Sequence, residues 1–232
     1  DVGDKIAYNP KAMTYYYILY NKTEQRFVYT GGRAYGTPAG YCDTLKDTRS
    51  DVEIFSWKTE LDYVTSINSR FLDGYCYTIL KDKEEHRYLY SYALRYQYGW
   101  ESIVKNKKYS LEKATDLDKA KFFGASAQRT YLIYATGSKL YAYDYVAETT
   151  KVLEDLGDQE ITLLHYDILI DTGTNDDFFY LGTYDPSQPK ETGGTLTRYR
   201  VVNDPNNILV EKVPGFSWSG LCKIKSIDFK KY

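Results

Sequence analysis

Hydrophobic and aromatic residues along this chain fall in short runs that polar residues separate. Residues 16–29 read YYILYNKTEQRFVY, in which an apolar run, a polar tetrad and a second aromatic-rich run follow one another. Two such runs across a short polar gap predict a β-hairpin. Residues 77–90 read YTILKDKEEHRYLY and match the first stretch at seven of fourteen positions. An internal repeat of this kind indicates stacked or radially repeated units.

The second half of the chain predicts two further hairpins. Residues 131–145 read YLIYATGSKLYAYDY, where Gly137-Ser138 has the composition of a two-residue type II′ turn. The fourth hairpin joins residues 178–185 to residues 194–202 through a loop that its prolines keep out of the sheet.

Further strand candidates flank these hairpins. Short alternating runs begin before each hairpin and once more near the end of the chain, at Lys5, Asp62, Ala120, Ile161 and Lys223. Weaker candidates follow three of the hairpins, at Ser102, Thr150 and Asn207. The recurring unit is four strands in about forty to sixty residues, as a β-propeller blade requires. Residues 110–120 carry the one helical signal, a capped polar turn or two.

The sequence therefore predicts an all-β, β-propeller-type fold of about four repeated four-stranded blades in a single domain, residues 1–232. The blades are expected at about residues 5–61, 62–119, 120–160 and 161–222, with a closing strand at 223–229. The fifth innermost run has no hairpin after it, and an open propeller edge invites pairing with other chains. We therefore expect the C-terminal portion of a larger propeller rather than a free four-bladed ring.

The composition strengthens the β prediction and excludes several function classes. The 27 tyrosines suit half-buried strand surfaces; they also offer an aromatic binding surface, although strand packing is the simpler interpretation. With 30 basic and 32 acidic residues, we expect no nucleic-acid partner. Cys42, Cys76 and Cys222 fit neither a disulfide framework nor a zinc site, and no cofactor is predicted. No apolar run reaches the roughly eighteen residues of a spanning helix.

The three tryptophans are the candidate binding residues. Trp57, Trp100 and Trp218 all fall in predicted loops, where strand packing explains a large aromatic side chain less readily. Aromatic residues in loops can stack on sugar rings or anchor a protein partner. Filling of gaps between blades is equally consistent with their positions.

An acidic stretch at residues 165–185 offers oxygen ligands of the kind that Ca²⁺ prefers. The candidate ligands are Asp171, Asn175, Asp176 and Asp177. Their spacing is not that of an EF-hand, and a solvated turn whose side chains cap their own backbone is the simpler interpretation. We therefore predict no metal site here.

Catalysis would need a convergent set of side chains that this sequence does not predict. A propeller glycosidase needs two carboxylates about 5–10 Å apart, and Asp62, Asp167 and Asp171 lie near the ends of inner runs. The sequence does not bring any two of them together. His86 and His165 are far apart, and no GxSxG motif accompanies them. We expect His86 to be exposed and His165 to be an inner-strand residue.

Four stretches resemble the C-terminal, propeller-like region of the PKD-like surface lipoproteins of Bacteroidetes. They are KLYAYDY at 139–145, EITLLHYD at 160–167, LGTYDPSQPKETGGTLTRYRV at 181–201 and GFSWSGLCKIKSIDFKKY at 215–232. The resemblance covers most of the chain after about Asp62 and rests on structural rather than catalytic patterns. It implies an exported, lipid-anchored protein at the cell surface of the outer membrane, whose anchor is not in this sequence. It also implies two partners, a TonB-dependent transporter and the surface-binding lipoprotein paired with it, which import glycans or peptides.

The sequence thus predicts a non-catalytic component or accessory of an outer-membrane nutrient-uptake complex. It would act by binding substrate or transporter partners through loops at one rim. The alternatives are a propeller glycoside hydrolase or lyase that uses loop carboxylates, and a structural scaffold without a small ligand.

Overall fold

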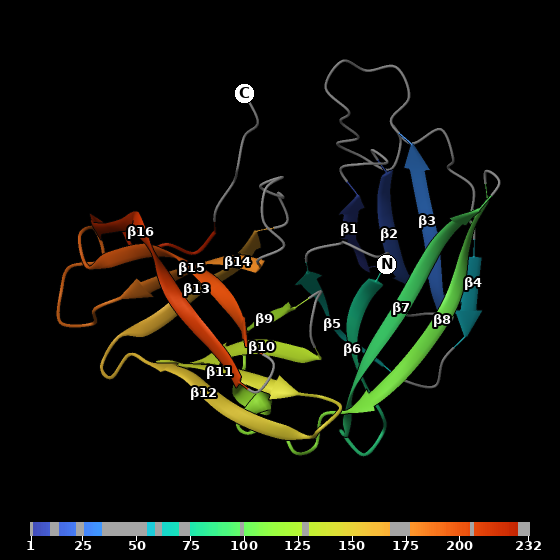
Figure 1. The fold of residues 1–232 in the computed structure, drawn as a ribbon, viewed down its shortest axis with the longest axis horizontal. Coiled ribbons are helices and arrows are strands. Elements are labelled where there is room, and N and C mark those ends of the chain that lie inside the picture. The colour runs from blue at the N-terminus through green and yellow to red at the C-terminus, as the bar shows by residue number, and fades with distance from the viewer. Residues whose placement is uncertain are drawn as a thin grey trace. The chain divides into compact units, whose positions relative to one another are not determined.

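The computed structural model describes residues 2–9, 14–21, 26–33, 55–58, 62–69, 75–97, 100–126, 130–167, 177–204 and 207–226 (Figure 1). Before residue 64, and for several strand residues beyond it, the description covers the backbone alone. The chain divides into two compact units, residues 1–112 and residues 113–232. No helix in the described ranges is long and apolar enough to cross a membrane.

Unit one contains two antiparallel four-stranded meanders, in which each strand pairs with the next along the chain. The strands of the first meander are β1 (Val2–Asn9), β2 (Thr14–Asn21), β3 (Arg26–Arg33) and β4 (Phe55–Lys58). Those of the second are β5 (Asp62–Ser69), β6 (Tyr75–Lys81), β7 (Arg87–Gln97) and β8 (Trp100–Ser110). The first strand of one meander, β1, contacts the first strand of the next, β5.

Unit two repeats this arrangement with two more antiparallel meanders. A short 3₁₀ helix, η2 (Leu117–Lys119), precedes the strands β9 (Phe122–Ala125), β10 (Tyr131–Thr136), β11 (Lys139–Asp144) and β12 (Thr149–Asp155). The last meander consists of β13 (Glu160–Asp167), β14 (Asp177–Tyr184), β15 (Gly194–Asp204) and β16 (Asn207–Leu221).

The all-β class and the four hairpins are confirmed. Each of the four predicted blade segments contains one four-stranded meander, although β4 lies in a stretch for which no strand was predicted. The type II′ turn fits as well, because Gly137 has a φ of 59° while Ser138 has no positive φ. The closure of the meanders into a propeller, and a single domain over the whole chain, stay predictions.

The predicted closing strand is wrong over its described part. Residues 222–226 form no strand, and residues 227–229 lie outside the described residues. The backbone N–H of Lys223 donates to the carbonyl oxygen of Lys190, in the loop between β14 and β15, at 2.7 Å. This segment therefore takes its hydrogen bond from a loop rather than from a neighbouring strand.

The repeated hairpins differ in register by one residue, despite their similar sequences. Asn21 pairs with Arg26 in the first copy, whereas Lys81 pairs with Arg87 in the second. The second copy therefore has a five-residue loop, residues 82–86, in place of a four-residue one. The sequence match did not indicate this difference.

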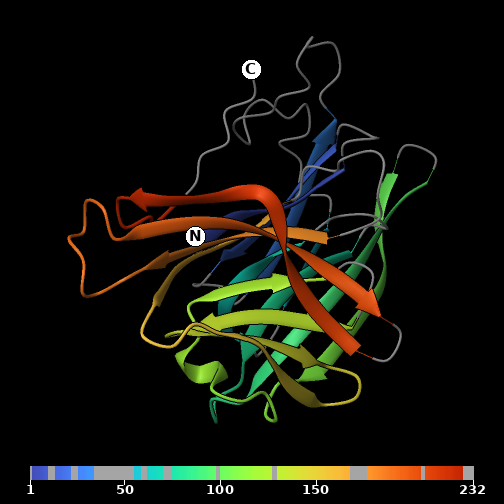
Figure 2. The ribbon, with the colours of Figure 1, turned by 60° about the vertical axis from the view of Figure 1, so that its left-hand side comes forward.

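The two meanders of unit two pack face to face around a shared core (Figure 2). Strand β13 contacts β9 and β10, and the outermost strands β12 and β16 also contact each other. Cross-strand neighbours Tyr166, Phe179 and Tyr199 form a ladder of stacked rings, with centroids 6.0 Å and 5.3 Å apart. Both meanders contribute to the core, whose buried members are Ile133, Ala135, Leu140, Ala142, Ile161, Leu164, Tyr166, Phe179, Leu181, Tyr199, Val201 and Ile208.

The opposite face of the β9–β12 meander is covered by the turn segment that carries η2. Tyr134 and Tyr141 stack on this face with ring centroids 5.2 Å apart. The Tyr134 hydroxyl donates to the carbonyl oxygen of Thr115 at 2.6 Å, and the Tyr141 hydroxyl donates to Oδ2 of Asp116 at 3.2 Å. The predicted polar turn is therefore present, and it covers tyrosine rings.

Gly124 of β9 lets the two meanders of unit two approach closely. A Cβ atom at this position would lie 2.3 Å from Cδ2 of the Tyr166 ring, well inside van der Waals contact. Burial raises the pKa of the Tyr166 hydroxyl well above 10, and the nearby Asp177 carboxylate raises it further. The ring therefore sits in a fully packed environment that leaves no room for an added methyl group.

We expect Gly124→Ala to lower the free energy of unfolding by about 1–3 kcal/mol, because the methyl group overpacks the core against Tyr166. Urea denaturation of this variant and of the wild type would measure the loss. In a Tyr166→Leu background the same glycine substitution should cost less, since the ring is gone. Equal costs in the two backgrounds would show that this contact does not limit the approach of the meanders.

Candidate binding site

The candidate site is built on the face of β14 and β15 that points away from the core. Along β14, Phe179 is buried in the core, while its neighbours Phe178 and Tyr180 are half-buried. Along β15, Tyr199 is buried and Arg198 is half-buried. Because side chains alternate along a strand, Phe178, Tyr180 and Arg198 share this outer face. Tyr180 and Arg198 are also direct cross-strand neighbours.

Arg198 lies among three aromatic rings. Its guanidinium carbon is 4.2 Å from the ring centroid of Phe178, 5.3 Å from that of Phe216 and 5.9 Å from that of Tyr180. These distances are in the range of cation–π attraction. The rings therefore hold the arginine side chain in place on the surface of the sheet.

A bulge in β16 brings Phe216 to this position. Tyr199 pairs with Lys212 and Thr197 pairs with Ser217, so residues 213–216 of β16 lie opposite Arg198 alone. Pro214 has no N–H to donate to the ladder, and Gly215 has a φ of 80°, which favours glycine. The strand bends sharply where the red ribbon turns in Figure 2. Bulges of this kind redirect side chains and are frequent beside functional sites.

Phe216 and Trp218 present the exposed part of the site. Their rings lie perpendicular, at 89°, with centroids 6.0 Å apart. Phe216 is 40% exposed and Trp218 is 43% exposed, more than any other aromatic side chain that the structure describes. We call Phe178, Tyr180, Arg198, Phe216 and Trp218 the aromatic–arginine patch.

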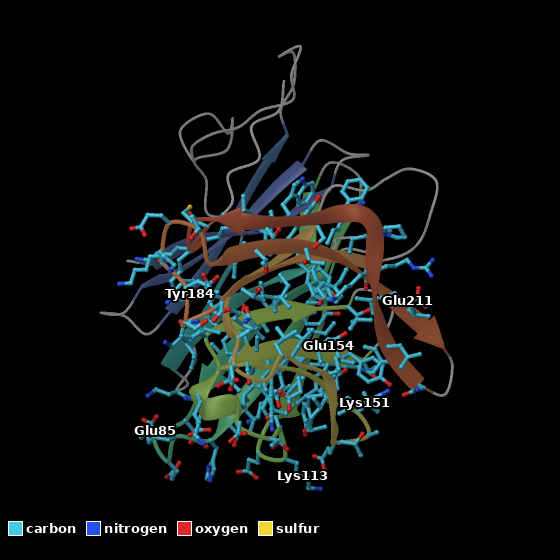
Figure 3. The ribbon with its side chains drawn as sticks, turned by 90° about the vertical axis from the view of Figure 1, so that its left-hand side faces the viewer. Glu85, Lys113, Lys151, Glu154, Tyr184 and Glu211 are labelled. Carbon is cyan, nitrogen blue, oxygen red and sulfur yellow. The ribbon has the colours of Figure 1, made fainter. Side chains whose placement is uncertain are left out.

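Polar groups adjoin the patch. Arg200 donates through Nη2 to Oε2 of Glu211 at 2.8 Å. These two residues are cross-strand partners, and their pair follows directly on the Tyr199–Lys212 pair that borders the bulge. The hydroxyls of Thr197 and Ser217 lie 3.1 Å apart where the pairing of β15 and β16 resumes. Figure 3 places Glu211 and Tyr184 toward opposite ends of this meander. The patch thus combines apolar ring faces with fixed polar groups, as ligand sites commonly do.

The prediction that the three tryptophans lie in loops is wrong. Trp57 lies on β4, Trp100 begins β8 and Trp218 lies on β16. Strand β16 continues through Pro214 and Gly215, which it accommodates as a bulge. Trp57 pairs with Phe27, a distant partner that no local pattern indicates. The side chains of Trp57 and Trp100 lie outside the described residues.

Four of the five patch residues were not predicted from the sequence, which indicated Trp218 alone. A usable signal was present in the Phe216-Ser217-Trp218 spacing, because residues two apart on a strand share a face. The approach of Arg198 depends on the bulge, and no local pattern predicts which residue lies opposite a bulge.

Of the four candidate calcium ligands, the structure describes one. Asp171, Asn175 and Asp176 lie outside the described residues. Asp177 begins β14, is fully buried and accepts a hydrogen bond from Oγ of Ser126 at 2.6 Å. Its carboxylate therefore lies inside the protein, not in the solvated turn that the sequence suggested.

The structure describes only strand positions for two of the candidate catalytic carboxylates. Asp62 begins β5 and Asp167 ends β13, and their side chains lie outside the described residues, as does Asp171. His165 is half-buried on β13, which confirms a strand position; that β13 is the inner strand of a blade stays a prediction. His86 is exposed, which is also confirmed.

The five-residue loop of unit one contains a cluster that sequence analysis did not recognise. Asp82, Glu84 and His86 each offer one ligand atom, and these atoms all lie within 4.8 Å of one another. This spacing is close enough for the three atoms to bind one metal ion. In this structure His86 pairs with two carboxylates: its Nδ1 lies 3.0 Å from Oδ2 of Asp82, and its Nε2 lies 3.3 Å from Oε1 of Glu112, which is outside the cluster. The alternating D-x-E-x-H spacing at residues 82–86 could have revealed this cluster.

These contacts shift the pKa values of both loop residues. The hydrogen bond to Asp82 raises the pKa of His86 above 6.5, and the charges of Asp82 and Glu112 add to this effect. For Asp82, desolvation favours a higher pKa, but hydrogen bonds from His86 and Tyr88 outweigh it and lower the pKa below 3.8. Both shifts favour the ion pair between protonated His86 and ionised Asp82.

Comparisons of the chain with protein-family models and with curated proteins give no match. The resemblance to the PKD-like surface lipoproteins accordingly stays a prediction.

The raised pKa of His86 predicts a pH-dependent contribution to stability. This contribution should be fully present below the unfolded-state value of about 6.5 and lost as pH rises through the higher folded value. An NMR titration of the two histidines, with His86→Gln to assign the signals, would give the folded pKa. Asp82→Asn should lower that pKa more than Glu112→Gln does, because the hydrogen bond to Asp82 is the larger cause. A pKa at or below 6.5 in the wild type would contradict the described pairing.

Proposed function

We propose that this chain is a non-catalytic binding domain whose aromatic–arginine patch recognises a glycan. The observation that carries the proposal is the exposed, perpendicular pair Phe216–Trp218 beside the ring-held Arg198. Exposed apolar surface with a polar rim marks interaction sites on soluble domains.

The chemistry of the patch suits a sugar. The exposed ring faces of Phe216 and Trp218 offer apolar surface for the C–H groups of a pyranose. Arg198 contributes N–H donors for the hydroxyl oxygens of the same sugar. The bulge in β16 and the rings around Arg198 fix these side chains beforehand, which reduces the conformational entropy lost on binding.

The described carboxylate beside the patch favours binding over hydrolysis. Glu211 already accepts a hydrogen bond from Arg200, its direct cross-strand neighbour. A glycosidase would need two carboxylates that face one sugar ring. We therefore propose recognition rather than catalysis, with the hydrolase or lyase as the alternative class.

We further propose that the four meanders are blades of a propeller. Two observations support this. Within every meander each strand pairs with the next strand along the chain. In both units the first strand of one meander contacts the first strand of the other, β1 with β5 and β9 with β13. The resemblance to the PKD-like surface lipoproteins supports placing the protein at the cell surface of the outer membrane, lipid-anchored. There it would serve a TonB-dependent transporter and the surface-binding lipoprotein paired with it.

Trp218→Ala should weaken glycan binding by roughly thirtyfold, the effect of removing an aromatic residue that dominates a binding site. A glycan array would identify the sugar, and calorimetry would compare the variants. The matched control is Leu209→Ala, which removes a 42% exposed apolar side chain from the same strand and should leave binding unchanged. Wild-type affinity in Trp218→Ala, with the fold intact, would exclude the patch as the binding site.

The proposed partners can be tested separately. The tagged protein, purified from native outer membranes, should co-purify with a TonB-dependent transporter and its lipoprotein in quantities near equal to its own. Mass spectrometry would measure those quantities. Recovery of the protein alone would remove the transporter from the proposal while leaving glycan binding open to the array.

A further inference from the structure

Unit two contains a second feature that the aromatic–arginine patch does not use, a pocket of about 340 Å³. It lies by the starts of β9 and β13 and the turn between β10 and β11. The N–H of Ile161 donates to the carbonyl oxygen of Gly137 at 2.8 Å, which fixes that turn to the start of β13. The residues that line the pocket are Lys119, Lys121, Phe122, Ala135, Thr136, Gly137, Glu160, Ile161, Thr162, Lys223 and Lys225.

Four of these residues are lysines, and their charges are only partly balanced. Nζ of Lys223 lies 2.6 Å from Oε2 of Glu160, and Nζ of Lys119 lies 3.1 Å from Oδ1 of Asp116. Lys121 and Lys225 form no ion pair within the described ranges, and both are exposed. The pocket therefore carries a net positive charge, in a chain whose overall charge is -2.

A buried hydroxyl provides an independent sign of a ligand. Thr162 is 7% exposed, and its Oγ1 has no hydrogen-bond partner among the described residues. Ile161 pairs with Thr183 and Leu163 pairs with Gly182, so Thr162 is the extra residue of a bulge in β13. Buried polar groups in proteins are nearly always satisfied, and an unsatisfied one calls for an explanation. The oxygen itself has almost no accessible surface, so a rotation of the Thr162 side chain, which lines the pocket, would bring it to a ligand oxygen there.

The size and the apolar lining limit what the ligand can be. A volume of about 340 Å³ is at the lower end for small-molecule sites and excludes a nucleic-acid duplex. Phe122 and Ile161 add apolar surface beside the lysines. An anionic group attached to a compact ring would use both parts of the lining.

We propose that this pocket binds an oxyanion group, the sulfate or carboxylate of an acidic sugar, through Lys121, Lys225 and Thr162. Charge-assisted hydrogen bonds from the two lysines supply most of the affinity. The hydroxyl of Thr162 donates to the same group. The pocket shares no residue with the aromatic–arginine patch, so this inference does not depend on the proposed glycan site.

Calorimetric titration of the full chain with glucuronic acid, inorganic sulfate and glucose tests the proposal. Glucuronic acid should bind, and glucose, which lacks the anionic group, should not. Tighter binding of glucuronic acid than of sulfate supports an acidic sugar as the ligand. Binding of sulfate without binding of glucuronic acid would overturn the proposal that the ligand is an acidic sugar. No binding of either anion at millimolar concentration and low salt would overturn the site as a whole.

Variants separate a specific site from general attraction. Lys121→Gln combined with Lys225→Gln should lower the affinity for glucuronic acid about tenfold or more, the usual effect of losing hydrogen bonds to a charged group. The control is Lys212→Gln, which changes an exposed lysine of β16 outside the pocket. This variant should bind glucuronic acid with unchanged affinity. Equal losses in both would show a nonspecific charge effect and overturn the site.

Thr162→Val provides a second readout that is independent of charge. It should lower the affinity while leaving the thermal stability of the ligand-free protein equal or higher, because it replaces an unsatisfied buried hydroxyl with an apolar group. Unchanged affinity would remove Thr162 from the site.

Discussion

The contact between the Tyr166 ring and the backbone of Gly124 sets how closely the two meanders of unit two can pack. The missing side chain at position 124 leaves the space that the ring fills, and the ring is the first of the Tyr166–Phe179–Tyr199 ladder. Because these three residues are direct cross-strand neighbours, the ladder ties the packing between meanders to the pairing within one of them. The outer face of β14 and β15 is free to carry the aromatic–arginine patch because the inner face supplies the core.

Tyrosine has two distinct uses in this unit. Tyr134 and Tyr141 direct their hydroxyls to Thr115 and Asp116 of the covering turn, which agrees with a dry ring and a polar tip. Tyr166 and Tyr199 are buried almost completely, and burial raises the pKa of Tyr199 to about 12. The abundance of tyrosine is therefore explained in these meanders mainly by packing, and the exposed patch depends instead on Phe216 and Trp218.

Each candidate site arises where a regular ladder is interrupted. Residues 213–216 form a bulge in β16 and bring Phe216 to Arg198, while Thr162 forms a bulge in β13 beside the lysine pocket. In unit one, the one-residue register difference between the repeated hairpins creates the loop that holds Asp82 and His86. A regular strand alternates its side chains strictly between two faces, so an extra residue is what allows polar or aromatic groups to converge.

The sequence by itself determined the all-β class, the four hairpins and the division into four-strand segments, since these follow from local alternation and turn residues. It also indicated the exposure of His86 and the position of His165 on a strand. Only the tertiary structure decided that Asp177 is buried against Ser126, that β16 continues through Pro214 and Gly215, and that the segment after Cys222 forms no strand over its described part. Asp177 depends on Ser126, 51 residues away in the chain, and the segment after Cys222 takes its hydrogen bond from the loop residue Lys190, 33 residues away from Lys223. Local patterns carry no information about such partners, because they specify which face a side chain takes and not what lies opposite it.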